Sequence, residues 1–281
     1  MNKTLLIAAA ALAAGVISSQ AQVYSQNVVG YVNQTIPAGS FQIIGGQLIN
    51  GSDLNKTNGD INTALTGLVS DVNGPPSGSN SVAYVWDPVH GGVATFYYFN
   101  GADATTWEAN PPTTYPAGFY DVGGSPLSLS LKPGIAVYIQ NAFSAPITVT
   151  SVGTVFQGTN VVTIVPGFQL ISFAAPVAGA PDSSNPIGLP SNLTSSTVGD
   201  QTHNDTLFVW DTVHGGVATF YYFNASDATT WEANPPTTYP AGFYDVGGSP
   251  LPTADYPQVN QGFYLYHNGA SIQWTNVFSV Q

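Results

Sequence analysis

The stretch that decides the fold is residues 82–100, which read VAYVWDPVHGGVATFYYFN. In its first part Val82, Tyr84 and Trp86 alternate with other residues, and a second apolar run starts at Val93, after a loop with two glycines. Two such runs joined by a short Gly-containing loop predict a β-hairpin. Aromatic residues fall on both faces of its second strand, so either both faces are covered or one presents aromatic rings.

Most of the hairpin lies in a segment that the chain contains twice. Residues 86–127 and 210–251 are identical at 39 of 42 positions. A repeat of this kind and a length of 281 residues both indicate two domains. We therefore expect a signal peptide over residues 1–21, a first β repeat over 22–150 and a second over 151–281. The near-identity has two explanations that one sequence leaves open, recent copying of the segment or retained function in it.

Composition and turn signals indicate the fold class. The chain contains 30 Gly, 21 Pro and 12% aromatic residues, while charged residues make up 6%, against about 25% in an ordinary soluble domain. Further strands are expected at 118–122, 135–140 and 147–156, and residues 61–68 are the one stretch expected to make a helical turn. The sequence predicts an all-β protein, a tandem repeat of two small β-sandwich or partly open barrel domains.

The first residues have the pattern of a secretory signal peptide. Lys3 precedes an apolar run from Leu5 to Ile17, and small residues stand before and at Ala21. The run is shorter than the roughly 18 to 20 residues that span a bilayer. We expect cleavage after Ala21, no membrane insertion afterwards, and a secreted or cell-surface protein, with the periplasm as another destination.

Charge excludes several classes of partner. The chain has 15 acidic residues, three Lys, no Arg and no Cys, and cleavage of the signal peptide would leave only Lys56 and Lys132 as basic residues. Nucleic acids and anionic bilayers are bound by clustered Lys and Arg, so neither is expected as a partner. Without Cys, disulfides, thiolate nucleophiles and thiolate zinc sites are excluded.

Four segments carry a resemblance to a known family. They are VYSQNVVGYVN at 23–33, PAGSF at 37–41, KPG at 132–134 followed by the expected strand at 147–155, and WTNVFSV at 274–280. With them the chain resembles a family of uncharacterised secreted bacterial proteins in which a signal peptide is followed by two β repeats. The resemblance implies secretion and a two-repeat β architecture, and it brings no established activity and no site residues. The almost verbatim copy of the central hairpin departs from the family pattern.

Candidate metal ligands are few. Asp87 and His90, with Asp211 and His214 in the copy, stand three residues apart and can share a metal ion or a proton, but metal sites need at least three ligands and the chain has four His. Residues 53–60 resemble a calcium loop, with the glycine one position late and Lys56 inside it. A turn is the favoured interpretation of both motifs, and no metal or cofactor is expected.

Catalytic motifs are equally weak. Ser125 and Ser249 lie in GGSPL, which lacks the second glycine of a nucleophile elbow. Glu108 and Asp121 each follow an aromatic residue, and two carboxylates are what glycoside hydrolysis requires. Because acidic residues provide nearly all the charge of this chain, solubility explains them as well. No catalytic residue is predicted.

Aromatic residues of the copied segment are the candidates for glycan binding, because rings cover the C–H face of a sugar while carboxylates take its hydroxyls. The candidates are Trp107, Glu108, Tyr115, Tyr120, Trp231, Glu232, Tyr239 and Tyr244. Trp107 and Tyr115 are expected to be the most exposed, beside a Pro-rich loop. The competing interpretation is that strand aromatics form the core.

These observations favour a secreted, non-enzymatic structural or interaction protein of the cell surface or extracellular matrix. The alternative is a bivalent polysaccharide-binding module that uses the aromatic residues duplicated in the two repeats. An enzyme is the third hypothesis, since no catalytic constellation stands out.

Overall fold

The computed structural model describes residues 29–49, 60–71, 80–87, 92–107, 115–211, 216–231 and 239–279. We call the described residues up to 155 the first half and those from 158 the second half. The strands of the first half are β1 (Val29–Ile36), β2 (Phe41–Gly45), β3 (Leu48–Ile49), β4 (Leu65–Thr66), β5 (Ser81–Asp87), β6 (Gly92–Phe99), β7 (Gly118–Tyr120), β8 (Ala136–Asn141) and β9 (Ile147–Val155).

Strands also dominate the second half. They are β10 (Gly158–Ile164), β11 (Gly167–Ser172), β12 (Thr206–Asp211), β13 (Gly216–Phe223), β14 (Gly242–Tyr244), β15 (Gly262–His267) and β16 (Ile272–Phe278). The helical segments are α2 (Ile61–Ala64), α3 (Gly101–Trp107), α4 (Ala225–Trp231) and the 3₁₀ turn η1 (Thr253–Asp255). The predicted all-β class is confirmed.

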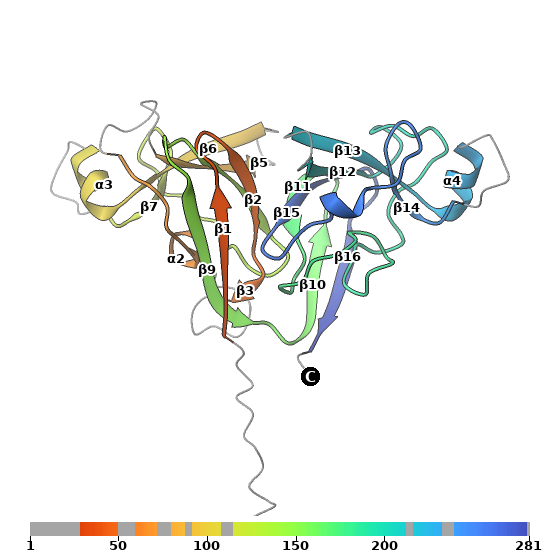
Figure 1. Ribbon diagram of the computed structural model, residues 1–281, viewed down its shortest axis with the longest axis horizontal. Coiled ribbons are helices and arrows are strands. Elements are labelled where there is room, and N and C mark those ends of the chain that lie inside the picture. Colours follow the sequence, from red (N-terminus) through yellow and green to blue (C-terminus); the bar gives the residue numbers. More distant parts are fainter. Residues whose placement is uncertain are drawn as a thin grey trace, which may run out of the picture.

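The strands of the described residues form four antiparallel sheets, none of which closes on itself. Two have five strands, in the orders β2-β8-β5-β6-β7 and β11-β15-β12-β13-β14. The two smaller sheets are β1-β9-β3, with β4 also on β9, and the pair β10-β16. The two five-stranded sheets therefore have the same strand order, and Figure 1 shows α3 and α4 at opposite ends of the molecule. A domain boundary between residues 150 and 151 stays a prediction; β9 runs across that position.

Each half has a core between its five-stranded sheet and its smaller sheet. In the first half Ala83, Val137 and Ile139 of the large sheet pack against Ile36 and Val149 of the small one. In the second half Leu207, Phe263 and Leu265 pack against Ile164 and Trp274. Alternate residues of the strands enter these cores, as the period of two in a half-buried strand requires.

Two short helices correct the expectation that only residues 61–68 make a helical turn. α3 starts where the side chain of Asn100 accepts a hydrogen bond from the backbone N–H of Asp103 at 2.9 Å. The copy repeats this cap between Asn224 and Asp227 at 2.9 Å, at the start of α4. An Asn followed three residues later by an acidic residue is a helix-start signal that the sequence contains and the prediction missed. The predicted turn at 61–68 is helical only over α2, which ends at Ala64.

The two halves meet through equivalent positions. The N–H of Gly45, at the end of β2, donates to the carbonyl of Asn260 at 2.8 Å, and the N–H of Ser172, at the end of β11, donates to the carbonyl of Gly134 at 3.1 Å. A Cβ on Gly262 would lie 2.4 Å from the Cβ of Ala136, so the backbones approach closely here. Both halves contribute the same kind of contact, as in a two-fold interface.

Candidate functional site

The tryptophans of the copied segment pack on their own half. The Trp107 ring stacks on Phe99 with centroids 4.6 Å apart and planes 8° apart, and Trp231 stacks on Phe223 at 4.4 Å and 20°. Phe99 and Phe223 are fully buried, while both tryptophans are half-buried. One face of each indole is therefore covered by the protein, and Trp107, expected among the most exposed rings of the segment, is half-buried.

The tyrosines of the same segment close these small aromatic clusters. Tyr115 meets Tyr120 edge to face at 5.8 Å, and Tyr239 meets Tyr244 in the same way at 5.8 Å. The hydroxyl of Tyr120 donates to the carbonyl of Pro116 at 2.6 Å. Tyr120 and Tyr244 are each 3% exposed, whereas Tyr115 and Tyr239 are half-buried.

Desolvation by burial raises the pKa of Tyr120 and of Tyr244. Neighbouring groups add to both shifts, Tyr115 in the first half and Asp182 and Tyr239 in the second. Of the eight predicted glycan-binding residues, Tyr120 and Tyr244 are buried in the two clusters, whereas the four other rings pack at the edges of the clusters and are half-buried. Glu108 and Glu232 lie outside the described residues.

Asp121, the other glycosidase candidate, organises the turn after β7. Its Oδ1 accepts hydrogen bonds from the N–H groups of Gly123 at 2.9 Å and Ser125 at 2.8 Å. Asp245 makes the equivalent contacts at 2.8 Å in the second half. A carboxylate that holds its own turn in this way is an Asx turn, so the geometry gives both residues a local structural role.

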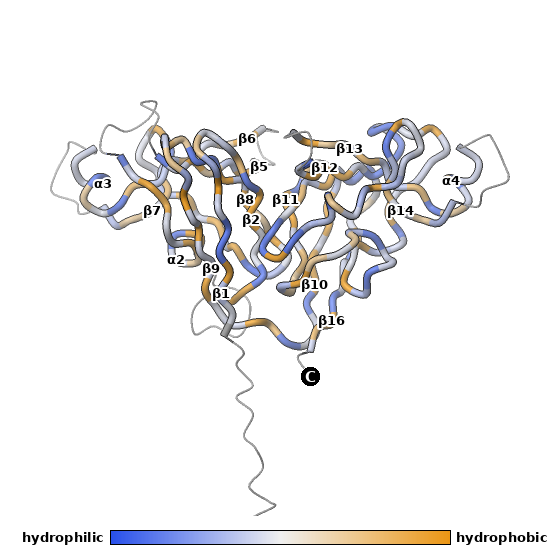
Figure 2. The backbone as a smooth tube through the Cα atoms, in the orientation of Figure 1, coloured by the Kyte–Doolittle hydropathy of each residue, from blue (hydrophilic) through white to orange (hydrophobic). Residues whose placement is uncertain are grey.

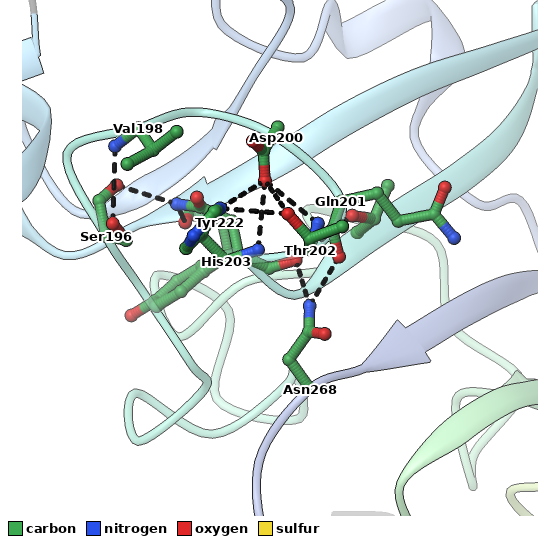
Figure 3. Close-up of polar contacts among 10 residues, drawn as sticks. Ser196, Val198, Asp200, Gln201, Thr202, His203, Tyr222 and Asn268 are labelled. Atoms are coloured by element: carbon green, nitrogen blue, oxygen red, sulfur yellow. Dashed lines mark hydrogen bonds and ion pairs between the residues drawn. The ribbon is translucent and has the colours of Figure 1, made fainter.

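An Asp-His-Thr cluster that the sequence did not single out lies on an exposed turn of the second half (Figure 3). Asp200 Oδ1 lies 2.7 Å from His203 Nδ1 and accepts from the Thr202 hydroxyl at 2.7 Å. These hydrogen bonds, first that of Thr202 and then that of His203, lower the pKa of Asp200. Both partners of His203 lie at Nδ1, whereas a catalytic triad needs the hydroxyl at the opposite ring nitrogen. The cluster therefore caps a turn.

A second Asp-His pair is fully buried. Asp205 Oδ2 lies 2.7 Å from His267 Nδ1 and also accepts from the N–H of Thr194 at 2.9 Å, while Oδ1 accepts from the N–H of Asn268 at 2.7 Å. The Nε2 of His267 donates to the carbonyl of Ala270 at 2.8 Å. Every polar end of the pair has a partner within the chain, so it joins β12, β15 and the loop before β12.

The candidate metal ligands of the sequence lie only partly within the described residues. No group of three His, Asp or Glu residues lies close enough there to hold an ion. His90, His214 and most of the calcium-like stretch at 53–60 lie outside the described residues. Its last residue, Asp60, caps α2 by accepting from the N–H of Asn62 at 3.0 Å.

The most extensive candidate surface is an aromatic face on the outer sides of the five-stranded sheets. We define it by eight half-buried rings, Phe41, Tyr84, Trp86, Tyr138, Phe168, Phe208, Tyr264 and Tyr266. Tyr84 lies directly opposite Tyr138, and Phe208 lies opposite Tyr264, so each pair points to the same side of its sheet. The neighbours of Tyr84 along its strand, Ala83 and Val85, point to the core instead.

Only Trp86 among these rings belongs to the copied segment, and none was predicted as a site residue. The alternation in β5 signalled which residues share a side of one strand. Which strands lie next to one another is a long-range property, so the sequence did not place Tyr138 beside Tyr84 or Tyr264.

No helix of the described residues is long and apolar enough to cross a membrane. No family model matches the chain, and neither a curated protein nor a solved structure matches it.

Proposed function

We propose that this is a secreted, non-enzymatic protein that acts at the cell surface or in the extracellular matrix as a structural or interaction protein. One observation supports this most. Eight described aspartates accept hydrogen bonds from nearby groups of the chain, mostly in turns and at helix starts: Asp60, Asp103, Asp121, Asp182, Asp200, Asp205, Asp227 and Asp245. A hydrolase needs such groups directed at a substrate.

The expected signal peptide and the family resemblance support the secreted location. The small number of charges supports a role in which the molecule packs against other extracellular material. The chain has 6% charged residues and a formal net charge of −12.

The experiment uses the envelope and matrix fraction of the cells that produce the protein. We expect the purified chain starting at Gln22 to co-sediment saturably with this fraction and to release no reducing sugar, peptide or fatty acid from it. We also expect protease added to intact cells to degrade the protein. Turnover of a component of the fraction, or full protection from the protease, would contradict the proposal.

The second candidate is bivalent polysaccharide binding by the copied segment. Its support is that Trp107, Tyr115, Trp231 and Tyr239 remain half-buried and lie in two clusters beside α3 and α4, at opposite ends of the molecule. Two separate sites would add avidity. Trp107→Phe with Trp231→Phe keeps a ring on Phe99 and Phe223 and removes the larger indole. Loss of retention on a polysaccharide column is expected from this candidate, and unchanged retention of the double variant would rule it out.

A further inference from the structure

The aromatic face is continuous across the two halves. Phe41 stacks on Tyr138 at 5.1 Å, and Tyr138 meets its equivalent Tyr264 edge to face at 5.9 Å. A second crossing joins Trp86 of the first half to Phe168 of the second at 5.4 Å. The rings of both halves therefore form one continuous surface, which begins at the junction between the halves.

This surface is open to solvent at several points. All eight rings are half-buried, and a pocket of about 210 Å³ opens between β5 and β11, lined by Trp86, Leu129, Val165, Pro166 and Phe168. Val93 and Val217 belong to the same side of the sheets and are 53% and 49% exposed. They lie opposite Trp86 and Trp210 in their sheets. A contiguous patch of accessible apolar groups is typical of an interaction site.

The polar groups of the face are neutral. Between the rings lie tyrosine hydroxyls and the amide of Gln140, whose Oε1 accepts from the Tyr84 hydroxyl at 2.6 Å. The described residues that point to this side of the two sheets include no Asp, Glu, Lys or His. Tyrosine hydroxyls are protonated at neutral pH. Burial raises the pKa of Tyr84 and Tyr138, and raises that of Tyr264 to about 12, which keeps these groups neutral over a wider pH range.

We propose that the aromatic face binds a neutral polysaccharide chain that crosses from one half to the other. Flat rings fit the apolar faces of sugar units, and neutral hydroxyl and amide groups fit their hydroxyls. The charge of the protein also favours a neutral ligand. The face has no ionic groups and the chain has a net charge of −12, so an acidic polymer would be repelled and would find no positive partner there. The inference rests on the proposed function, a non-enzymatic protein that acts by binding, and names its ligand class and surface.

The test is calorimetric titration of the chain from Gln22 with a soluble neutral glucan, a soluble neutral xylan and an acidic polygalacturonate. The variant is Trp86→Thr with Phe208→Thr, since Thr suits a strand. We expect saturable binding of a neutral polymer, no binding of the acidic one, and about tenfold weaker binding by the variant, as the loss of two stacked rings implies. The matched control is Tyr31→Thr, which removes an aromatic ring on β1 that is 66% exposed. This variant should bind like the unaltered chain.

The outcomes distinguish a failure of this inference from a failure of the proposed function. Unchanged affinity in the double variant with a native circular dichroism spectrum would place any sugar site elsewhere, and the Trp107→Phe with Trp231→Phe variant would then locate it. Retention on the envelope fraction without binding of any neutral polymer would overturn the inference and leave the proposed function standing. Capture of a protein through this face, lost in the variant, would also overturn it.

Discussion

The two copies of the hairpin segment have nearly the same sequence and the same local structure but different surroundings. Both form a strand, a seven-residue helix and a short edge strand at equivalent positions. Yet Tyr222 is 1% exposed, whereas its equivalent Tyr98 is half-buried. In the second half, the loop before β12 contacts this tyrosine, since the Tyr222 hydroxyl donates to the carbonyl of Ser191 at 3.1 Å and Leu189 and Leu193 of the loop belong to the same core. Local sequence sets the elements, and drifted flanks set how deeply they are buried.

A second difference concerns the polar anchors beside the copies. The second half uses the buried pair Asp205 and His267 at the start of β12 and the end of β15. At the equivalent ends of β5 and β8 the first half has Ser81 and Asn141, which hold the N–H of Val69 and the carbonyls of Ile36, Pro37 and Ala145. The same strand order can thus hold two different pairs of buried polar residues at this position, because the residues of each pair have hydrogen-bond partners.

The largest expected effect separates the two equivalent tyrosines. Tyr222→Ala should lower the free energy of unfolding by about 4 kcal/mol, because it leaves a cavity beside Phe243 and removes the hydroxyl that donates to the Ser191 carbonyl. Tyr98→Ala should cost about 2 kcal/mol, since part of its ring is already in water. Urea unfolding followed by circular dichroism measures both, and equal losses would show that the loop before β12 contributes no additional burial.

The next effect tests the two anchors. Asp205→Ala should cost about 3 kcal/mol, because His267 and two backbone N–H groups lose their acceptor inside the protein. Ser81→Ala removes the acceptor of one N–H and should cost about 1 kcal/mol. The same unfolding experiment compares them. A larger loss from Ser81→Ala than from Asp205→Ala would contradict the role given to the buried pair.

A smaller effect should be the same in both copies. Asp121→Ala and Asp245→Ala each remove the acceptor of two turn N–H groups, so each should cost about 1 kcal/mol. The two turns share no contacts, and the double variant should therefore show the sum of the single losses. Thermal unfolding of the three variants is the measurement. A loss confined to one copy would mean that its surroundings, and not the turn itself, set the cost.

The smallest effect distinguishes the equivalent residues Tyr138 and Tyr264 by pH. Burial, then the neighbouring Tyr138, raises the pKa of Tyr264 to about 12 from the ordinary 10.0, so the unfolded chain loses this proton at lower pH than the folded protein does. Stability should therefore fall as the pH rises from about 10 to about 12. Tyr264→Phe should flatten this fall more than Tyr138→Phe does, as measured by urea unfolding at a series of pH values. Identical slopes in the two variants would contradict the deeper burial of Tyr264.

Sequence patterns predicted much of the fold and little of the candidate surface. The alternation around Tyr84 and Trp86 placed β5 and its hairpin partner correctly, because side-chain period is a local property. The same reasoning missed α3 and α4, although Asn100 and Asp103 form a recognisable helix start. The sequence singled out Trp107 and Tyr120 as candidate glycan-binding rings, but Tyr120 is buried in a cluster with Phe99, because whether a ring faces water depends on what packs over it.

The sequence by itself determined the β class, the near-identical copies and a composition with 6% charged residues and no Arg. The tertiary structure alone decided which aromatic residues share a face. Tyr138 and Tyr264 are 126 positions apart in the chain and meet at 5.9 Å only because two separate sheets pack through Gly45, Gly262 and their neighbours. The physical reason is that strand order and junction geometry depend on contacts between distant segments, whereas turns, caps and strand alternation depend on residues a few positions apart.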